Sequence, residues 1–455
     1  MGLQIIEKSD PKEKKDKPKL ALVLAGGAIS GGAFKVGGLK ALNDYLVNRK
    51  VTDFDIYVGL SAGAFLTAPI AGGIPPEEML ASLDGSSKAF GQLSPFDFYR
   101  PNFSEFFSRP LKYVYGHLTY FPGILYDLFA SYPNLQKDFW NNLKTLLLHP
   151  NYSNYEQLTK PLFRVAYTTR TIPTLGELFP SGLCDNKPLE VYLRENMKKN
   201  RMTNNFKVLK RMRNRSLYIV ATNLDTSERV IFGPDEKNDV SISEAIQAST
   251  AIPGFYKPAR IKGIDYIDGG VRKTANLDVA FDKGADLVIC YNPFRPFNND
   301  ILIEYLREEN KYYTKSKRIS DGGIGMIFNQ VFRTLFHSRL KVAMETYKED
   351  PNFKKDIILL EPQEDEKDFF ELNPLFFWNR AKSAAHGFES VSRSIEGKFD
   401  QVSTLLKKYG VEMTRDVVKM DVNKIEQSKF DDTVIMDVLE KRAPRRKFQV
   451  MQGGR

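Results

Sequence analysis

The chain of 455 residues contains few cysteines and few histidines. Cys184 and Cys290 are its two cysteines, and neither lies beside other residue types that ligate metals. This spacing argues against both a disulfide framework and a zinc site, so we expect two reduced thiols in a cytoplasmic protein. The four histidines, none of which lies in a recognisable motif, are His117, His149, His337 and His386.

Long apolar runs are also scarce. Residues 57–76 carry no charge and approach the length of a membrane span, but they include glycines and prolines. We therefore predict a buried core segment there and not a membrane helix. Residues 1–17 are highly charged and lack the apolar core of a signal peptide, so we predict a disordered lead-in.

Positive charge exceeds negative charge, giving a net charge of +10 at pH 7. A basic chain favours an anionic partner, and both a phospholipid membrane and a nucleic acid are anionic. The charge by itself does not distinguish these two partners.

A serine stands between two glycines in residues 59–63, GLSAG. The apolar residues before it predict a strand, and residues 62–71 predict a helix, so Ser61 would lie on a strand-to-helix turn. Gly59 and Gly63 would let that turn tighten without a side-chain clash. The pattern is typical of a nucleophile elbow, and the alternative is a glycine-rich turn with an incidental serine.

A glycine loop precedes this elbow. Residues 20–25 predict a buried parallel strand, and residues 33–48 predict a helix. Between them lie Gly26, Gly27 and Ala28, whose small side chains leave the backbone N–H groups accessible. The order of strands and helices brings both turns to the carboxyl ends of neighbouring strands, around one crevice. The loop lacks the lysine of a nucleoside-triphosphate loop and the dinucleotide spacing, so it favours oxyanion donors.

Aromatic residues are concentrated between residues 90 and 132, interleaved with prolines and glycines. One interpretation is a helical subdomain that packs on itself. The other is an apolar cover over a site for long acyl chains, because aromatic side chains provide a large apolar area.

A second α/β portion begins near residue 216. Residues 242–251 predict a helix, with Ser241 as its N-cap and Glu244 completing a capping box. From about residue 301 to residue 409 helical patterns dominate. The strands predicted in this half of the chain are residues 217–223, 229–232, 285–291 and 356–360.

A serine nucleophile needs a base. A Ser-Asp-His order could be met by Ser61 with His337 or His386. Asp268 offers another solution, since it ends an apolar run and precedes two glycines that would expose it at a sharp turn. In a partly desolvated crevice a carboxylate becomes a stronger base, so a Ser-Asp pair is chemically sufficient.

Together the glycine loop, the elbow and the Asp-Gly-Gly sequence at 268–270 resemble the patatin-like phospholipases, in the same order. The segment 245–255 is also similar to the stretch before that family's aspartate. The resemblance implies an α/β, three-layer fold with a mostly parallel central sheet, and a lipid acyl hydrolase with a catalytic dyad and no catalytic histidine. The matching positions are Ser61 as nucleophile, Asp268 as base, Gly26, Gly27 and Ala28 as oxyanion hole, Gly59 and Gly63 in the elbow, and Gly269 and Gly270 after the aspartate.

Two positions depart from the family pattern. Ala28 replaces a third glycine and restricts the backbone. Ser30 replaces a basic residue that is often present, so a charge that could bind anionic head groups is missing from the loop. Lys35 lies nearby in sequence, but its position on a helix leaves the direction of its side chain open.

The predicted organisation follows from these segments. We expect the lead-in at 1–17, a catalytic domain at 18–295 with an aromatic-rich helical insertion at about 85–160, a mainly helical C-terminal extension at 296–440 that packs on the catalytic domain, and a basic flexible tail at 441–455.

We therefore predict a phospholipase A or lysophospholipase that needs no metal and no organic cofactor. A nonspecific carboxylesterase or acyltransferase with the same dyad is one alternative, and a non-catalytic membrane-associated scaffold is another. We expect a lipid substrate, an anionic membrane surface as partner and no nucleic acid; a homo-oligomer is left open. The expected location is cytoplasmic, and the alternative is a peripheral position at the inner membrane face.

Overall fold

The computed structural model describes residues 2–10, 17–87, 90–169, 173–299, 301, 303–306, 311–314, 317–428 and 431–440. The chain divides into two compact units. Unit 1 comprises Met1–Arg100 and Asp185–Arg455, and unit 2 comprises Pro101–Cys184. The predicted basic tail, residues 441–455, lies outside the described residues.

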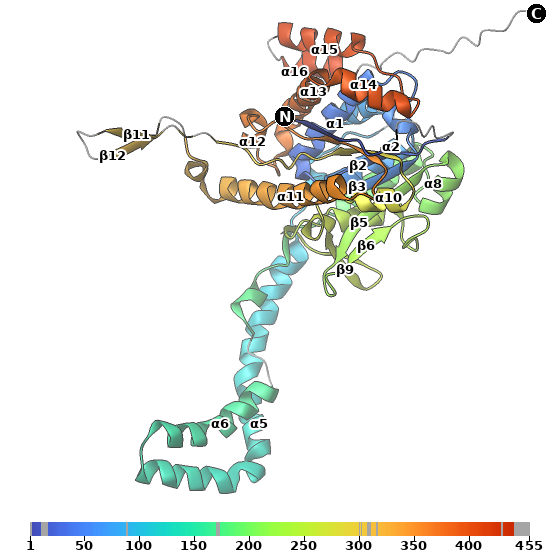
Figure 1. Ribbon diagram of the computed structural model, residues 1–455. Coiled ribbons are helices and arrows are strands. Elements are labelled where there is room, and N and C mark those ends of the chain that lie inside the picture. The colour runs from blue at the N-terminus through green and yellow to red at the C-terminus, as the bar shows by residue number, and fades with distance from the viewer. Residues whose placement is uncertain are drawn as a thin grey trace, which may run out of the picture. The chain divides into compact units, whose positions relative to one another are not determined.

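A nine-stranded sheet forms the centre of unit 1 (Figure 1). Its order is β1-β13-β10-β2-β3-β5-β9-β8, with β6 paired to β5. The central strands from β13 to β5 are parallel, whereas β1, β6, β8 and β9 pair in antiparallel fashion. The predicted mostly parallel α/β sheet is thus confirmed. The strands are β1 (Leu3–Ile6), β2 (Leu20–Leu24), β3 (Ile56–Leu60), β5 (Ser216–Asn223), β6 (Arg229–Phe232), β8 (Ala259–Ile261), β9 (Ile264–Asp268), β10 (Leu287–Tyr291) and β13 (Asp356–Leu360).

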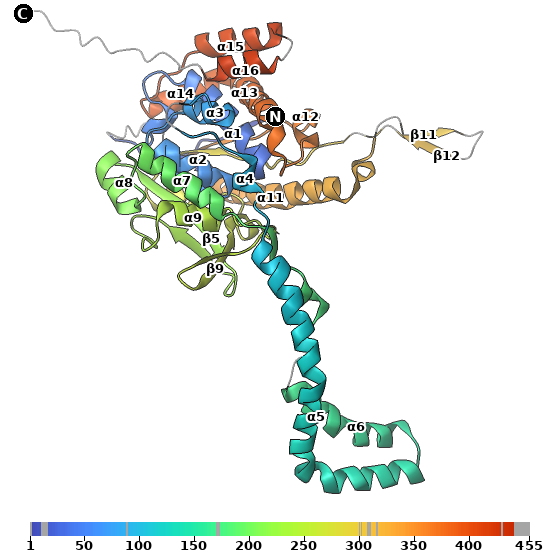
Figure 2. The ribbon, with the colours of Figure 1, turned by 180° about the vertical axis from the view of Figure 1, so that it is seen from behind.

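Helices cover both faces of this sheet (Figures 1 and 2). Side chains of a strand alternate between its faces, so Leu22 of β2 joins one apolar cluster and Val23 joins the other. The first cluster includes residues of α1, α2, α9 and α13, and the second includes residues of α10 and α11. The helices are α1 (Ala28–Tyr45), α2 (Ala62–Ala71), α3 (Pro76–Asp84), α4 (Pro95–Phe98), α7 (Lys187–Lys199), α8 (Phe206–Arg213), α9 (Ile242–Ser249), α10 (Leu277–Asp282), α11 (Gly323–Glu349), α12 (Lys367–Glu371), α13 (Arg380–Glu396), α14 (Phe399–Lys408), α15 (Asp416–Gln427) and α16 (Asp432–Leu439).

The first helix begins earlier than its sequence predicts. Helix α1 starts at Ala28 and not near residue 33, so residues 28–32, which the sequence places before the helix, are part of it. The N–H groups of its first turn need partners outside the helix. Pro374 supplies one, because its carbonyl accepts from the N–H groups of Ile29 and Ser30 at 2.9 and 3.0 Å. A segment far along the chain therefore fixes where α1 begins.

The prediction of disorder for residues 1–17 is wrong for Leu3–Ile6, which form β1. This strand pairs with β13, with Leu3 opposite Leu360. Leu3 and Ile6 are buried, so backbone pairing and apolar burial together hold the segment at the sheet edge.

The region after residue 295 contributes to the same body. Besides β13, it supplies α13, which crosses α1 closely: a Cβ on Gly37 would lie 1.8 Å from the Ala384 carbonyl oxygen, and one on Gly387 would lie 1.9 Å from that of Phe34. The two glycines thus allow the helix backbones to meet. Two strands that the sequence does not predict, β11 (Ile303–Leu306) and β12 (Lys311–Thr314), form a hairpin here.

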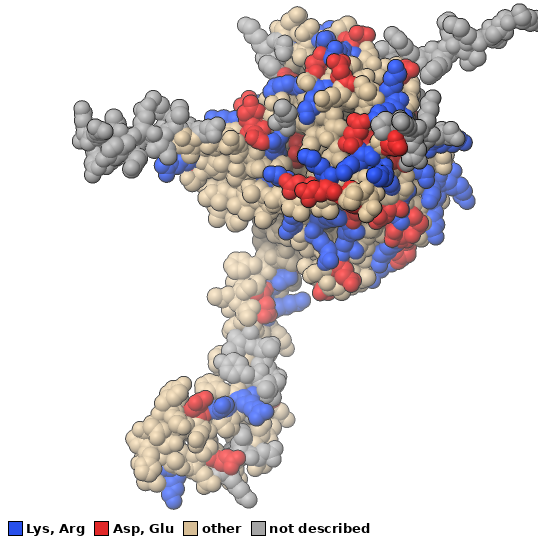
Figure 3. Space-filling view, viewed as in Figure 1, with Lys and Arg blue, Asp and Glu red and all other residues tan. Residues whose placement is uncertain are grey.

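Unit 2 is helical. It contains α5 (Phe103–Leu148), with three internal prolines, and α6 (Tyr152–Thr169), which pack on one another, followed by the short strand β4 (Gly182–Cys184). Most aromatic side chains of α5 are exposed, and their ring contacts are between near neighbours on the helix, such as Phe103 with Phe107 and Tyr120 with Phe121. Charged side chains are sparse on the face of unit 2 seen in Figure 3. No described helix is both long enough and apolar enough to cross a membrane.

Candidate active site

Ser61 lies on the turn between β3 and α2. Its backbone adopts φ 54° and ψ −128°, a combination that costs a non-glycine residue roughly 1–3 kcal/mol. The residue is only 4% exposed. This is the strained strand-to-helix turn that presents a serine hydroxyl at the end of a parallel strand.

The two flanking positions require glycine, because neighbouring atoms leave no room for a Cβ. A Cβ on Gly59 would lie 2.2 Å from Thr67 Oγ1, and one on Gly63 would lie 2.1 Å from the carbonyl oxygen of Leu24. Gly63 therefore lets α2 start directly against the end of β2. This contact brings the elbow beside the glycine loop, which leaves the same strand.

Helix α9 holds the elbow from the other side. The Ser61 N–H donates to Ser249 Oγ at 2.8 Å, and that hydroxyl donates to the Val220 carbonyl at 2.6 Å. Two residues further on, the Ala251 carbonyl accepts from the Asp268 N–H at 2.9 Å. One helix end therefore contacts the backbone of both candidate catalytic residues. Ser249 was not predicted as a site residue, although it lies in the segment 245–255 that resembles the family.

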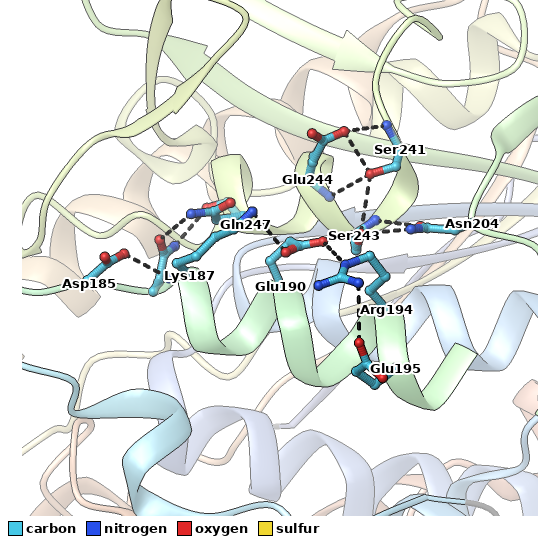
Figure 4. Close-up of polar contacts among 11 residues, drawn as sticks. Asp185, Lys187, Glu190, Arg194, Glu195, Asn204, Ser241, Ser243, Glu244 and Gln247 are labelled. Carbon is cyan, nitrogen blue, oxygen red and sulfur yellow. Dashed lines mark hydrogen bonds and ion pairs between the residues drawn. The ribbon is translucent and has the colours of Figure 1, made fainter. Parts of the chain in front are cut away.

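A polar network fixes α9 against α7 (Figure 4). Ser241 and Glu244 form the predicted capping box. Ser243 Oγ donates to buried Glu190 at 2.9 Å, and the side chain of Asn204 pairs with Ser243. Since α9 is anchored at its N-terminal end, the position of Ser249 at its other end is defined.

Asp268 ends β9 and is 7% exposed. It lies opposite Ala221 of β5, a strand that also pairs with β3 and β6. Its carboxylate accepts from the Gly270 N–H at 2.8 Å. Burial raises the pKa of Asp268 to about 6, although a hydrogen bond from Ser61, the Gly270 N–H and the charge of Lys35 act in the opposite direction. The fold thus brings the Asp268 carboxylate and the Ser61 hydroxyl together.

The histidines have other neighbours. Nδ1 of His337 lies 3.2 Å from Glu361, and burial lowers the pKa of His386 in a different part of unit 1. Among the hydrogen bonds of the described residues, no histidine pairs with Ser61 or Asp268. The geometry therefore offers no Ser-Asp-His triad at this position.

The glycine loop lies next to the serine. A Cβ on Gly26 would be 3.5 Å from Ser61 Cβ. Within the described part of the chain, the N–H groups of Gly26, Gly27 and Ala28 donate to no protein acceptor, whereas those of the next two residues donate to Pro374. The loop therefore has unused donors beside the serine, as an oxyanion hole requires.

The two departures from the family pattern have distinct structural consequences. Ala28 adopts φ 50°, in the left-handed region that favours glycine. Ser30 is buried, so it does not present a polar group to a head group. Lys35 brings a cation to this loop, because its Nζ donates to the carbonyls of Ala25 and Gly26. Its side chain therefore points at the loop from inside the protein.

An apolar cavity of about 80 Å³ adjoins Ser61. Its walls come from α1, α2, the residues that follow α9, and the segments around residues 93–98 and 375–380. The side chains and backbone that line it belong to Ala28, Ile29, Gly32, Ala33, Val36, Ser61, Ala62, Phe65, Leu66, Leu83, Leu93, Phe98, Leu189, Thr250, Ile252, Tyr256, Leu375, Phe377 and Arg380. Such a lining suits a hydrocarbon chain attached to an ester carbonyl at Ser61.

No group of three or more histidine, cysteine, aspartate or glutamate side chains in the described residues lies close enough to hold a metal ion. Both cysteines are free thiols. Burial raises the pKa of Cys290, which lies on β10, and also that of Cys184. Neither thiol is activated as a nucleophile.

The chain matches a protein-family model and is similar to several solved structures. The family model described as Patatin-like phospholipase matches residues 22–281, more than half of the chain, including the glycine loop, the elbow and Asp268. Similar solved structures include VipD from Legionella pneumophila, with 16% identity over 87% of this chain and 70% of that chain and a TM-score of 0.35. Human GIVD cytosolic phospholipase A2 in complex with methyl gamma-linolenyl fluorophosphonate has 8% identity over 86% of this chain and 60% of that chain, with a TM-score of 0.29. Pseudomonas aeruginosa ExoU in complex with SpcU has 12% identity over 94% of this chain and 70% of that chain, with a TM-score of 0.26.

Proposed function

Because the chain belongs to the patatin-like phospholipase family and is a lipid acyl hydrolase, we propose that Ser61 and Asp268 form its catalytic dyad and cleave carboxylic esters of membrane phospholipids or lysophospholipids. The observation that carries the proposal is the closeness of the strained elbow serine to a buried carboxylate: the Ser61 hydroxyl lowers the pKa of Asp268, and the end of α9 binds the backbone of both residues. A carboxylate with a pKa near 6 is ionised at neutral pH and is a stronger base than an exposed one.

The reaction has two halves. Asp268 takes the proton of the Ser61 hydroxyl while the oxygen attacks the ester carbonyl, and the resulting oxyanion accepts from the N–H groups of Gly26, Gly27 and Ala28. The tetrahedral intermediate collapses, the leaving alcohol takes the proton from Asp268, and an acyl-enzyme remains. Water then gives a proton to Asp268 and attacks the acyl carbon. The second tetrahedral intermediate collapses, Asp268 returns this proton to the departing Ser61 oxygen, and the fatty acid is released.

The apolar cavity supports a lipid acyl group as the part of the substrate that is recognised. Besides Ser61, its lining has three polar side chains, Thr250, Tyr256 and Arg380, and Arg380 stacks on Phe377 and donates to the Leu83 carbonyl. Selectivity is therefore expected to follow the length of the acyl chain more than the head group.

The exposed face of α5 supports a membrane surface as partner. Apolar residues recur along it at helical spacing and form a stripe, each at least 59% exposed. A lipid substrate lies in such a surface, and an apolar helix face with aromatic side chains suits the boundary between acyl chains and water. The stripe consists of Phe103, Phe107, Leu111, Leu118, Phe121, Leu125 and Phe129.

Hydrolysis of phospholipids, lysophospholipids, triacylglycerols and short esters by wild type, Ser61→Ala and Asp268→Asn tests the dyad. Both variants should lose at least about 1,000-fold in kcat, and Ser61→Ala should no longer react with a fluorophosphonate probe. His337→Ala and His386→Ala are the controls and should remain active. Retained hydrolysis in folded Ser61→Ala would refute the assignment.

The same panel separates the alternatives. Turnover of short esters alone would indicate a carboxylesterase, and transfer of the acyl group to an added alcohol would indicate an acyltransferase. Vesicle binding without turnover or probe labelling would indicate a scaffold.

Co-sedimentation with phosphatidylcholine vesicles, with and without anionic lipid, tests the α5 stripe. Replacing Phe107, Leu118 and Phe129 with serine should weaken binding at least about tenfold, because buried apolar area is lost. A control with serine at the exposed polar residues Lys112, Asn141 and Lys144 of the same helix should keep binding to neutral vesicles. Equal binding by both variants would contradict the assignment of this surface.

A further inference from the structure

Lys35 is a buried cation beside the proposed active site. Its side chain is fully enclosed on α1, and it takes part in no ion pair among the described residues. Instead, its Nζ donates to the carbonyl of Ala25 and, at 2.9 Å, to that of Gly26. Lys40, on the same helix and equally buried, forms an ion pair with Asp44. A lysine with carbonyls as its hydrogen-bond partners is the more costly arrangement, because no opposite charge within contact compensates for its desolvation.

The two carbonyls belong to the peptide units of two proposed oxyanion donors. The Ala25 carbonyl shares its peptide unit with the Gly26 N–H, and the Gly26 carbonyl shares its unit with the Gly27 N–H. A cation bound to a peptide oxygen withdraws electron density from the unit and makes its N–H a stronger donor. We propose that Lys35 is the positioning residue of the oxyanion hole, which orients and polarises the Gly26 and Gly27 N–H groups toward the developing negative charge.

The surroundings of Lys35 fit an electrostatic role. In a water-excluded site a charge acts over several ångströms with little screening. Burial lowers the pKa of Lys35 to about 7, while Asp268 from β9 and Cys290 from β10, the titratable groups that face it, raise it again. Since burial keeps the Cys290 thiol neutral, the ionised Asp268 is the group that stabilises the ammonium. The cation of the site is therefore present together with the base.

A purely structural role makes a different prediction. If Lys35 only fastened the loop, an uncharged side chain of similar length that donates to the same carbonyls would serve equally well. Lys35→Gln retains an N–H donor but has no charge. Lys35→Met retains the apolar stem but has neither a donor nor a charge. The two variants therefore separate the hydrogen bonds from the charge.

The inference rests on the proposed function, so hydrolysis of a phospholipid and of a short ester is measured for both variants, with Ser61→Ala in parallel and Lys40→Met as a buried-lysine control. We expect kcat to fall about 100-fold in Lys35→Met and at least about 10-fold in Lys35→Gln, with KM changed less than about threefold. Lys40→Met should lose stability but keep its kcat per folded molecule.

The pH profile gives a readout that a structural role would not change. Wild-type kcat should decline on the alkaline side as Lys35 loses its proton, and both Lys35 variants should lack this decline. Their acid limb should move to higher pH, because the charge of Lys35 lowers the pKa of Asp268.

Wild-type kcat and an unchanged alkaline limb in Lys35→Gln would overturn the inference, and so would a wild-type profile without an alkaline limb. If Lys35→Met does not fold, Lys35→Gln and the wild-type profile decide. Hydrolysis retained by Ser61→Ala would instead refute the proposed function. An inactive Ser61→Ala beside a fully active Lys35→Gln would refute only the role of Lys35.

Discussion

The hydroxyl of Ser249 accepts a hydrogen bond from the Ser61 N–H at 2.8 Å and joins the strained elbow to the end of α9. The same helix end receives the Asp268 N–H at the Ala251 carbonyl. A serine in an unfavourable backbone conformation persists only when its surroundings over-determine it. Helix α9 supplies that constraint and links the two proposed catalytic residues through the backbone.

Ser249→Ala should therefore lower kcat about tenfold with little change in KM, because the elbow loses the acceptor of its N–H. Loss of this buried hydroxyl should also lower the free energy of unfolding by about 1–3 kcal/mol. Ser243→Ala is the matched control, since it removes a buried hydroxyl of the same helix that bonds Glu190. Denaturant unfolding should show a similar loss in the free energy of unfolding for the two variants. The same kcat in Ser249→Ala and Ser243→Ala would contradict the positioning role of Ser249.

Gly63→Ala should destabilise the protein by roughly 3 kcal/mol or more, or prevent folding, because its Cβ would lie 2.1 Å from a backbone oxygen of β2. Gly325→Ala on α11 is the control. No atom lies within 4 Å of its new Cβ, so helix propensity should raise stability by up to about 1 kcal/mol. Thermal unfolding measures the stability of both variants. An equal change in stability for Gly63→Ala and Gly325→Ala would mean that the elbow relaxes around the new Cβ.

Asp268 should link activity and stability to pH with opposite signs. Catalysis needs the carboxylate, so kcat should rise as the pH increases through about 6. Because folding raises the pKa of Asp268 from 3.8 to about 6, the folded state binds more protons than the unfolded state between these values, and stability falls as the pH rises. The loss amounts to about 3 kcal/mol.

Asp268→Asn lacks this titration. It should be inactive yet more stable than wild type at pH 7, and the difference should vanish near pH 4. Urea unfolding of wild type and Asp268→Asn at both pH values measures this difference in stability. A less stable Asp268→Asn at pH 7 would show that the carboxylate is not buried as an ionised group.

The cavity beside Ser61 should set the preference for acyl-chain length. Leu93→Phe should shift kcat/KM toward short chains by about 10-fold, and Leu93→Ala should shift it toward longer ones, since Leu93 lines the cavity. Leu80→Ala removes a buried leucine that does not line it and should leave the preference unchanged. A series of p-nitrophenyl esters gives the comparison, and an unaltered preference in both Leu93 variants would place the acyl chain elsewhere.

Local patterns in the sequence were sufficient to predict much of the fold. The helix after the elbow, Ala62–Ala71, and the late strand, Asp356–Leu360, have the predicted bounds, because an apolar run between glycines or charged residues defines each one locally. The Ser241 capping box was also predictable, since its partner lies three residues away. The three motifs together were sufficient to identify the family that the comparison confirms.

The contacts that position the site could not be predicted in this way. The Ser61 N–H donates to Ser249, Lys35 donates to a carbonyl of the glycine loop, and Leu3 pairs with Leu360. These contacts form only after the sheet and its helices have packed. Even the exposure of the α5 aromatics contradicts what their hydrophobicity suggests. The sequence by itself determined the local elements and the residue types of the site. The tertiary structure decided which of them meet and which are buried, because burial and long-range hydrogen bonds depend on elements that lie far apart in the chain.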